Sequence, residues 1–208
     1  MTDDVQTTPR PIKIVGIAGS LRRQSLNRGL LAAARELAPD GIDLQIHDLA
    51  DIPMYNGDVE KEGIPAPVIR FAEAIANADA LLVVTPEYNG GIPGVLKNAL
   101  DWASRSTVGS PLLSKPVGIM GVSPGRFATA RAQEQLKLTL LATKSNIFLG
   151  AGLALGQAAD KFESGILVDP ATKDFVGSYL GRFAEWIRQS LDHTSIEGLP
   201  AQTTPVAS

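Results

Sequence analysis

The stretch Ala80-Leu-Leu-Val-Val-Thr-Pro-Glu-Tyr-Asn-Gly-Gly91 decides the predicted fold. Its first five residues are all apolar, which is typical of a central strand in a sheet that is covered on both faces. The residues that follow are rich in Pro, Asn and Gly, and they indicate a sharp turn where the strand ends. The stretch therefore predicts a buried strand that leads into a stiff, exposed loop.

Similar apolar runs and amphipathic stretches alternate along the rest of the chain. The predicted strands are Ile12–Ile17, Ile42–Leu49, Ala80–Val84, Pro116–Val122 and Asn146–Leu149. The predicted helices are Leu26–Ala38, Pro65–Asn77, Pro93–Ser104, Ala128–Thr143 and Asp174–Asp192. Because strands and helices alternate, we expect an α/β fold in which helices cover both faces of a five-stranded parallel sheet.

The composition is that of one ordinary globular domain. The chain has 208 residues, of which 44% are hydrophobic and 20% charged. This is long enough to bury a substantial core, and we expect a single domain over residues 12–193. The ends, 1–11 and 195–208, are polar, carry prolines and lack periodicity, so they are predicted to be flexible tails.

Composition also excludes several classes of function. The absence of cysteine excludes disulfides, thiolate metal sites and cysteine nucleophiles, and the presence of only His47 and His193 argues against a metal centre. Nineteen basic and 22 acidic residues give a net charge of −3, which argues against a nucleic-acid partner. Residues 1–11 lack the apolar core of a signal peptide, and no apolar stretch is long enough to span a membrane. We therefore expect a cytoplasmic protein without a membrane partner.

Three loops are candidates for a functional site. In open α/β sheets, the loops at the carboxyl ends of the strands meet in one crevice, where ligands bind. The segments Ala18–Asn27, Thr85–Pro93 and Val122–Arg126 all follow predicted strands and have unusual compositions. Their shared position predicts one site rather than three unrelated turns.

The first of these loops has the composition of a phosphate site. Ser20, Ser25 and Asn27 offer neutral donors and Arg22 a charged one, just before a predicted helix whose amino end attracts anions. Alternatively, Ser25 or Asn27 caps the helix and the arginine is solvated. The loop matches neither a nucleotide P-loop nor the dinucleotide pattern G-x-G-x-x-G, so a mononucleotide phosphate is favoured.

The second loop suits a planar heterocycle such as a flavin. Pro86 and Gly90 shape a stiff backbone with outward amides, Tyr88 offers a flat apolar face, and Asn89 can both donate and accept. The alternative is a tight turn with Tyr88 packed on the surface. Glu87 is expected either to face the amino end of a helix or to be solvated.

The third loop again precedes a predicted helix. Gly125 permits close approach of the backbone, Ser123 can donate to the edge of a ring, and Arg126 can meet a negative ligand. Taken alone, the segment favours an ordinary strand–helix turn. Its position beside the other two loops favours a role in the same site.

Two motifs carry a family resemblance. The pattern G-S-L-R-x-x-S-x-N at residues 19–27 and T-P-E-Y-N-G-G-I-P-G-x-L-K-N-A-L-D-W at residues 85–102 resemble the NADPH-dependent FMN reductase family, above all its chromate/quinone reductase-like and azoreductase-like members. The resemblance runs from about Ile12 to Arg188 and is strongest before Arg105. It implies a flavodoxin-like three-layer sandwich with sheet order 2-1-3-4-5, a non-covalently bound FMN, and a homodimer or homotetramer.

The resemblance also implies which residues hold the cofactor. The family's phosphate loop corresponds to Ser20, Arg22, Ser25 and Asn27. Its loop for the isoalloxazine ring corresponds to Pro86, Glu87, Tyr88, Asn89 and Gly90. Its third loop, at the flavin edge, corresponds more loosely to Ser123, Gly125 and Arg126. No catalytic side chain and no metal are expected, because FMN carries the chemistry.

The resemblance implies an NAD(P)H-dependent oxidoreductase with FMN as cofactor and NADPH or NADH as co-substrate. We expect hydride to pass through FMN to a small-molecule acceptor: a quinone, an azo or nitro compound, chromate or free flavin. Both histidines are expected to be structural or solvated, and Trp102 to pack in the core. The alternatives are a flavodoxin-like electron carrier, or a redox sensor that binds FMN without direct NAD(P)H turnover.

Overall fold

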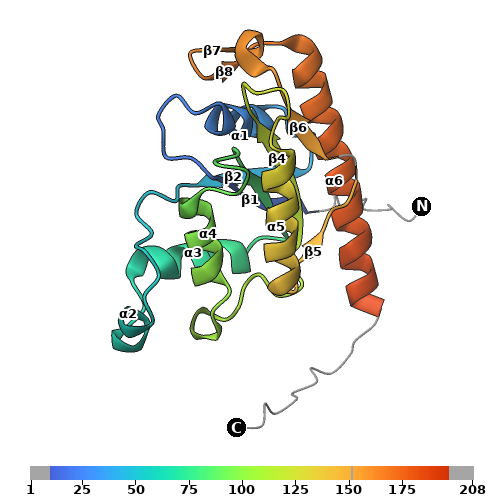
Figure 1. The fold of residues 1–208 in the computed structure, drawn as a ribbon. Coiled ribbons are helices and arrows are strands. Elements are labelled where there is room, and N and C mark those ends of the chain that lie inside the picture. The colour runs from blue at the N-terminus through green and yellow to red at the C-terminus, as the bar shows by residue number, and fades with distance from the viewer. Residues whose placement is uncertain (1–9, 151, 197–208) are drawn as a thin grey trace, which may run out of the picture.

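The computed structural model describes residues 10–150 and 152–196 and confirms the predicted α/β architecture (Figure 1). A parallel sheet of order β2-β1-β3-β4-β5 lies between two layers of helices, and β6 extends it beside β4. Its strands are β1 (Ile12–Ala18), β2 (Ile42–His47), β3 (Ala80–Val84), β4 (Pro116–Val122), β5 (Asn146–Ile147) and β6 (Leu153–Leu155). The helices are α1 (Leu26–Glu36), α2 (Gly57–Glu62), α3 (Ala66–Ala76), α4 (Gly94–Ala103), α5 (Ala130–Ala142) and α6 (Pro170–Ile196). A hairpin, β7 (Phe162–Glu163) and β8 (Ile166–Leu167), precedes α6.

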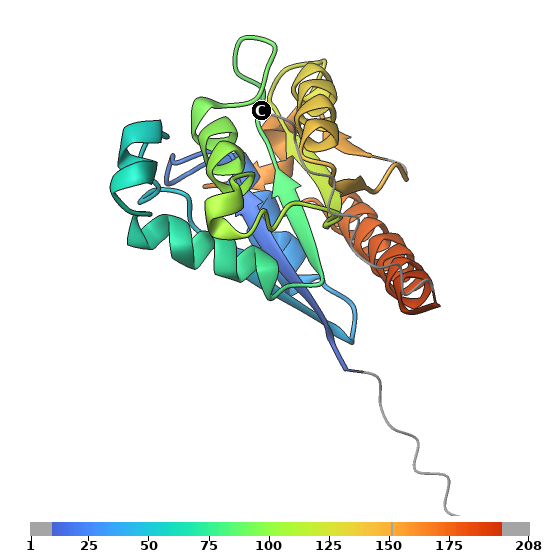
Figure 2. The ribbon, with the colours of Figure 1, turned by 90° about the horizontal axis from the view of Figure 1, so that it is seen from below.

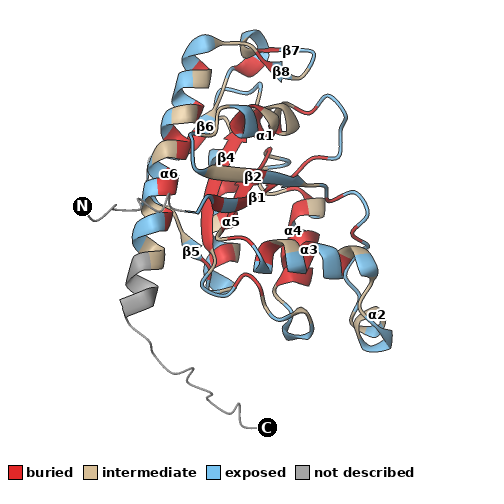
Figure 3. Ribbon diagram, turned by 180° about the vertical axis from the view of Figure 1, so that it is seen from behind, coloured by how far each residue is buried: buried red, intermediate tan, exposed pale blue. Residues whose placement is uncertain are grey.

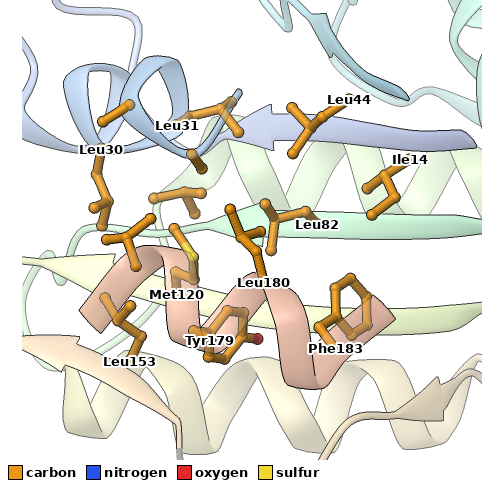
Figure 4. Packing of buried hydrophobic residues seen from close by; sticks show 14 of the residues in the cluster. Ile14, Leu30, Leu31, Leu44, Leu82, Met120, Leu153, Tyr179, Leu180 and Phe183 are labelled. Atoms are coloured by element: carbon orange, nitrogen blue, oxygen red, sulfur yellow. The ribbon is translucent and has the colours of Figure 1, made fainter. Parts of the chain in front are cut away.

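The central strands are buried, as their apolar composition predicts (Figure 3). Successive side chains of a strand point to opposite faces of the sheet, and β3 supplies two separate cores in this way. Leu82 and Val84 pack on the α1–α6 side, where Figure 4 shows Leu82, whereas Leu81 and Val83 pack against α3 and α4 on the other side. Trp102 is fully buried in the second core, in agreement with its predicted packing role.

The predicted fifth strand is split into two pieces. Strand β5 pairs with the start of β4 and ends at Ile147, short of the predicted Leu149, while β6 pairs with the end of β4. Between them, the Tyr179 hydroxyl on α6 accepts a hydrogen bond from the Ile119 amide at 2.8 Å and donates to the Ile119 carbonyl at 3.0 Å. A side chain therefore takes the place of a neighbouring strand at this position.

Two helices and one hairpin also differ from the sequence prediction. Helix α2 forms inside the predicted loop 50–64, where the Asn56 side chain accepts from the Asp58 amide at 2.9 Å and caps the helix. Helix α6 begins at Pro170 rather than Asp174, because Asp169 accepts from the Thr172 amide at 2.8 Å and starts it earlier. The β7–β8 hairpin is too short to show a strand pattern in the sequence.

The predicted tails lie outside the described residues, apart from Arg10, Pro11 and the last residues of α6. Arg10 makes two hydrogen bonds of 2.8 Å to the Asp79 carboxylate, and the Lys13 amide donates to the same group at 2.9 Å. These bonds hold the pKa of Asp79 below its usual value. Among the helices described, none combines the length and apolar character needed to cross a membrane.

Candidate cofactor-binding site

The three loops singled out in the sequence leave adjacent parallel strands. Strand β3 lies between β1 and β4, with Ala18 opposite Val84 and Val84 opposite Met120. The Gly19 amide continues the β1–β3 pairing with a 2.8 Å hydrogen bond to the Val84 carbonyl. Figure 2 shows the loop after β3, in green, projecting beyond the end of its strand. The loops therefore start side by side at one edge of the sheet, as predicted.

The first loop ends at the amino terminus of α1. The Ser25 hydroxyl accepts a hydrogen bond from the Arg28 amide at 3.4 Å, so Ser25 caps the helix. This is the alternative to a phosphate-binding role that the sequence left open. A hydroxyl that accepts one bond keeps its own proton to donate. Arg22 is exposed. In the described part of the chain, no acceptor takes the amides of Leu26 or Asn27. The loop thus presents unpaired N–H groups at the positive end of the helix dipole.

The side chain of Asn27 bonds to the protein backbone and, contrary to the prediction, does not point its donor at a phosphate site. Its side-chain amide donates to the Val122 carbonyl at 2.8 Å, and its side-chain oxygen accepts from the Val122 amide at 3.0 Å. The residue is 3% exposed, so both bonds are buried. Asn27 therefore joins the first loop to the end of β4, while its backbone N–H stays free for an anion.

The second loop contains a tight turn. The Tyr88 amide donates to the Gly91 carbonyl at 2.9 Å, and the Gly91 amide returns a bond of 3.0 Å. The two residues between them, Asn89 and Gly90, have φ of +52° and +78°, the pattern of a hairpin turn that favours Asn-Gly. No acceptor among the described residues takes the amides of Asn89 and Gly90, so both are available to a ligand.

The first and second loops touch each other. The Ser20 hydroxyl lies 3.5 Å from that of Tyr88, whose side chain is otherwise half-exposed. Gly19 also lies close to the second loop and α4, because a Cβ there would be a tight 3.3 Å from Pro86 and 3.2 Å from Leu96. The Tyr88 hydroxyl therefore lies beside the first loop, while much of its ring is exposed and available to contact a planar group.

Glu87 faces the amino terminus of α5, which confirms one of its two predicted positions. Its carboxylate accepts from the amides of Arg131 and Ala132 at 3.0 and 3.2 Å, and it forms an ion pair with the Arg131 side chain. Burial raises the pKa of the Glu87 carboxyl, but the bonds from Arg131 and Ala132 outweigh this effect and lower it below the usual value. Glu87 thus fastens the second loop to α5.

The third loop is hydrogen-bonded to β6 and to the segment that follows it. The Ser123 amide donates to the Leu155 carbonyl at 2.9 Å, and the Gln157 amide donates to the Gly125 carbonyl at 3.2 Å. The Ser123 hydroxyl accepts a hydrogen bond from the Gly125 amide at 3.1 Å, so its own O–H remains available to donate. Arg126 is exposed.

Two residues that shape the site, Arg131 and Gln135, were not predicted from the sequence. Arg131 pairs with Glu87, and Gln135 accepts from the Ile92 amide at 2.6 Å, so successive turns of α5 hold both ends of the Tyr88–Gly91 turn. Each lies more than 40 positions from its partner, and neither belongs to a local motif. Only the packing of α5 beside the second loop brings them together.

The residues present fit a phosphorylated planar ring. Free amides at the start of α1 suit a phosphate, and free amides at Asn89 and Gly90 suit the polar edge of a heterocycle. The NADPH-dependent FMN reductase family matches residues 12–160 of the chain. The chain belongs to this family. Both the predicted family and the flavodoxin-like order of the sheet are therefore confirmed.

Individual relatives agree with this assignment. An NAD(P)H-dependent FMN reductase of Pseudomonas aeruginosa is 42% identical over 179 residues, which cover 86% of this chain and 96% of that protein. A quinone reductase of Pseudomonas putida is 37% identical, over 83% of this chain and 92% of its own length. The solved structure of the flavoenzyme NAD(P)H:(acceptor) oxidoreductase of Paracoccus denitrificans superposes with a TM-score of 0.78 at 32% identity, covering 86% of this chain and 98% of that one. At the level of the family, the expected NAD(P)H-dependent reductase and its FMN cofactor are confirmed.

Proposed function

We propose that this protein is an FMN-dependent NAD(P)H:quinone reductase whose cofactor lies across the three loops at the ends of β1, β3 and β4. Bound FMN supplies the redox chemistry by taking hydride from the nicotinamide and passing electrons to the acceptor. The observation that carries the proposal is that two groups of free backbone amides, at the start of α1 and at Asn89–Gly90, lie on adjacent strand ends.

The first loop would hold the phosphate. The amides of Leu26 and Asn27 and the hydroxyls of Ser20 and Ser25 can donate to its oxygens, and Arg22 can supply a charged bond. Asn27 would act as a positioning residue, because both polar groups of its side chain are bonded to Val122.

The second and third loops would hold the ring. Amides at Asn89 and Gly90 can bond to its polar edge, where negative charge develops on reduction. Tyr88 would cover part of the ring, and Pro86 and Glu87 would fix the position of the turn. Ser123, Gly125 and Arg126 would border the edge nearest β4.

A quinone is the acceptor best supported by the relatives, since several are named quinone reductases. Stacking on one face of a flavin selects for planar shape rather than for specific hydrogen bonds. Azo and nitro compounds and free flavin are therefore compatible acceptors, and chromate could be attracted by the exposed Arg22 and Arg126.

We also propose that the protein is a homodimer or homotetramer. Leu113, Leu138 and Leu141 are 56%, 69% and 60% exposed, and Leu138 and Leu141 lie one turn apart on α5. The same helix holds the second loop through Arg131 and Gln135, so a partner placed there would lie beside the flavin ring. Light scattering should show an oligomer that Leu138→Asp shifts toward monomer, and a monomeric wild-type chain would contradict this.

Anaerobic mixing of the FMN-loaded protein with NADPH tests the activity. We expect the visible flavin band to bleach, and a quinone added afterwards to restore it. Because NADP⁺ leaves before the quinone enters, steady-state rates should follow ping-pong kinetics. An electron carrier would show no rapid bleaching, and a redox sensor would bleach without multiple turnovers with quinone, so either outcome would refute the proposal.

A further inference from the structure

A separate cavity lies on the other side of the first loop, toward β2. It has a volume of about 330 Å³ and is lined by residues from the first turns of α1, the end of β2 and the tip of the β7–β8 hairpin. This volume is within the range of small-ligand sites. Its lining includes Arg23 and Ser25 from the first loop but nothing from the loops after β3 and β4. The cavity therefore borders the proposed phosphate site and is distinct from the ring site.

The hairpin forms a fixed wall of this cavity. The tip of the hairpin packs directly on α1, because a Cβ on Gly29 would overlap the carbonyl oxygen of Gly165. Ser164 and Gly165 have φ of +51° and +85°, which closes the hairpin in a two-residue turn. Phe162 and Leu167 anchor it in the core. The cavity is thus preformed, and binding need not order the hairpin first.

The polar groups of the cavity include a fixed carboxylate and an unpaired cation. Asp48, just after β2, accepts from the Arg28 guanidinium at 2.8 Å and from the Ala50 amide at 3.0 Å. The Arg28 hydrogen bond helps to keep the pKa of Asp48 low, so the group is ionised at neutral pH. Arg23 is exposed, and no carboxylate among the described residues pairs with it. It is therefore free to meet a phosphate.

Apolar side chains complete the lining. Ile46 on β2 and Ile166 on β8 are 40% and 67% exposed, and both line the cavity. Exposed isoleucines on two separate elements offer surfaces to a flat apolar group. A simple anion would leave these residues without a role, and a purely apolar molecule would leave Asp48 and Arg23 without one.

We propose that this cavity binds the adenosine 5′-phosphate half of a dinucleotide. Ile46 and Ile166 would contact the base, Asp48 the ribose hydroxyls, and Arg23 the phosphate. In the Rossmann dinucleotide fold, an acidic residue after the second strand binds the ribose. This chain lacks the G-x-G-x-x-G turn of that fold, but Asp48 occupies the corresponding place directly after β2. The adenylate belongs either to NAD(P)H or to FAD taken in place of FMN. The assignment of the adenylate to NAD(P)H or FAD rests on the function proposed above. The proposal that the cavity binds an adenylate does not depend on that function.

Calorimetric titration of the FMN-loaded protein with AMP tests the cavity directly. We expect saturable binding that weakens about tenfold in Arg23→Ala, the effect of losing one charged hydrogen bond, and also weakens in Ile166→Ala. Arg35→Ala on α1 and Ile69→Ala on α3 are exposed controls that should bind AMP as the wild type does. Absence of AMP binding, or equal affinity in the cavity and control variants, would overturn the proposal.

Two further comparisons identify the source of the adenylate. If it belongs to NADPH, Arg23→Ala should raise the KM for NADPH about tenfold and leave that for reduced nicotinamide mononucleotide, which lacks adenylate, unchanged. If it belongs to FAD, the variant should weaken FAD binding to the apoprotein and leave FMN binding unchanged. AMP binding without either effect would refute a dinucleotide. Failure of NADPH to reduce the flavin would refute the reductase function instead and leave the AMP result standing.

Discussion

The side chain of Asn27 forms a closed pair of hydrogen bonds with the backbone of Val122, donating at 2.8 Å and accepting at 3.0 Å. The two residues are 95 positions apart. They connect the start of α1, where a phosphate would bind, to the end of β4, where the third loop begins. The geometry of the proposed cofactor site therefore depends on one buried amide that need not touch the cofactor through its side chain.

Replacing Asn27 with Ala should destabilise the protein by about 2–4 kcal/mol, because two buried backbone groups lose their partners. The free energy of unfolding in urea measures the loss. Asn146→Ala changes an exposed residue and should stay within about 0.5 kcal/mol of wild type. FMN affinity of the folded Asn27 variant should also fall. Equal stability of the two variants would show that the Asn27 bonds contribute nothing.

Glu87 should make stability depend on pH in the acid range. Its pKa in the folded protein lies below the ordinary value of 4.5, so its contribution is complete above 4.5 and is lost as the pH falls through the lowered pKa. Glu87→Gln should therefore lose less stability than wild type between neutral and acid pH. Urea midpoints across this range, with the exposed Glu73→Gln as control, provide the measurement. Parallel curves for wild type and Glu87→Gln would contradict the assignment.

Arg22→Ala should weaken FMN binding by about tenfold, the effect expected when one charged hydrogen bond to the phosphate is lost. The absorption spectrum of the bound flavin should not change, since different loops would hold the phosphate and the ring in the proposed site. Fluorescence titration gives the affinity, and Arg35→Ala, also exposed, controls for the loss of charge. Unchanged FMN affinity would exclude Arg22 from the phosphate site.

Tyr179→Phe should destabilise the protein by roughly 3 kcal/mol, because the amide and carbonyl of Ile119 both lose their partner in the interior. Tyr55→Phe removes a hydroxyl that donates to Glu60 at 2.7 Å near the surface, and should cost only about 0.5–1.5 kcal/mol. Urea denaturation of both variants tests the comparison. Equal losses would argue against Tyr179 as a substitute for a strand at Ile119.

Local sequence pattern was sufficient for the strands that build the site. The bounds of β3 and β4 match the prediction because continuous apolar runs end in Pro- and Gly-rich turns. The hairpin-type turn at Asn89–Gly90 follows from the same local chemistry. Once adjacent parallel strands are recognised, general topology places their carboxyl-terminal loops together.

Long-range partners were not predictable in the same way. No residue near Asn27 in the sequence indicates that its side chain bonds to Val122. Likewise, no residue near Glu87 indicates that its carboxylate pairs with Arg131 rather than facing solvent. The break in the fifth strand depends on Tyr179, whose hydroxyl reaches β4 only after α6 has packed on the sheet. Such contacts belong to tertiary structure, and a pattern of neighbouring residues does not specify them.

Parallel calorimetric titration of the apoprotein with FMN and with riboflavin tests whether the three loops hold a phosphorylated flavin. We expect one FMN bound per chain and much weaker binding of riboflavin, because the amides at the start of α1 would have no phosphate to bind. If FMN does not bind, or if riboflavin binds with equal affinity, the proposed site at the three loops is wrong.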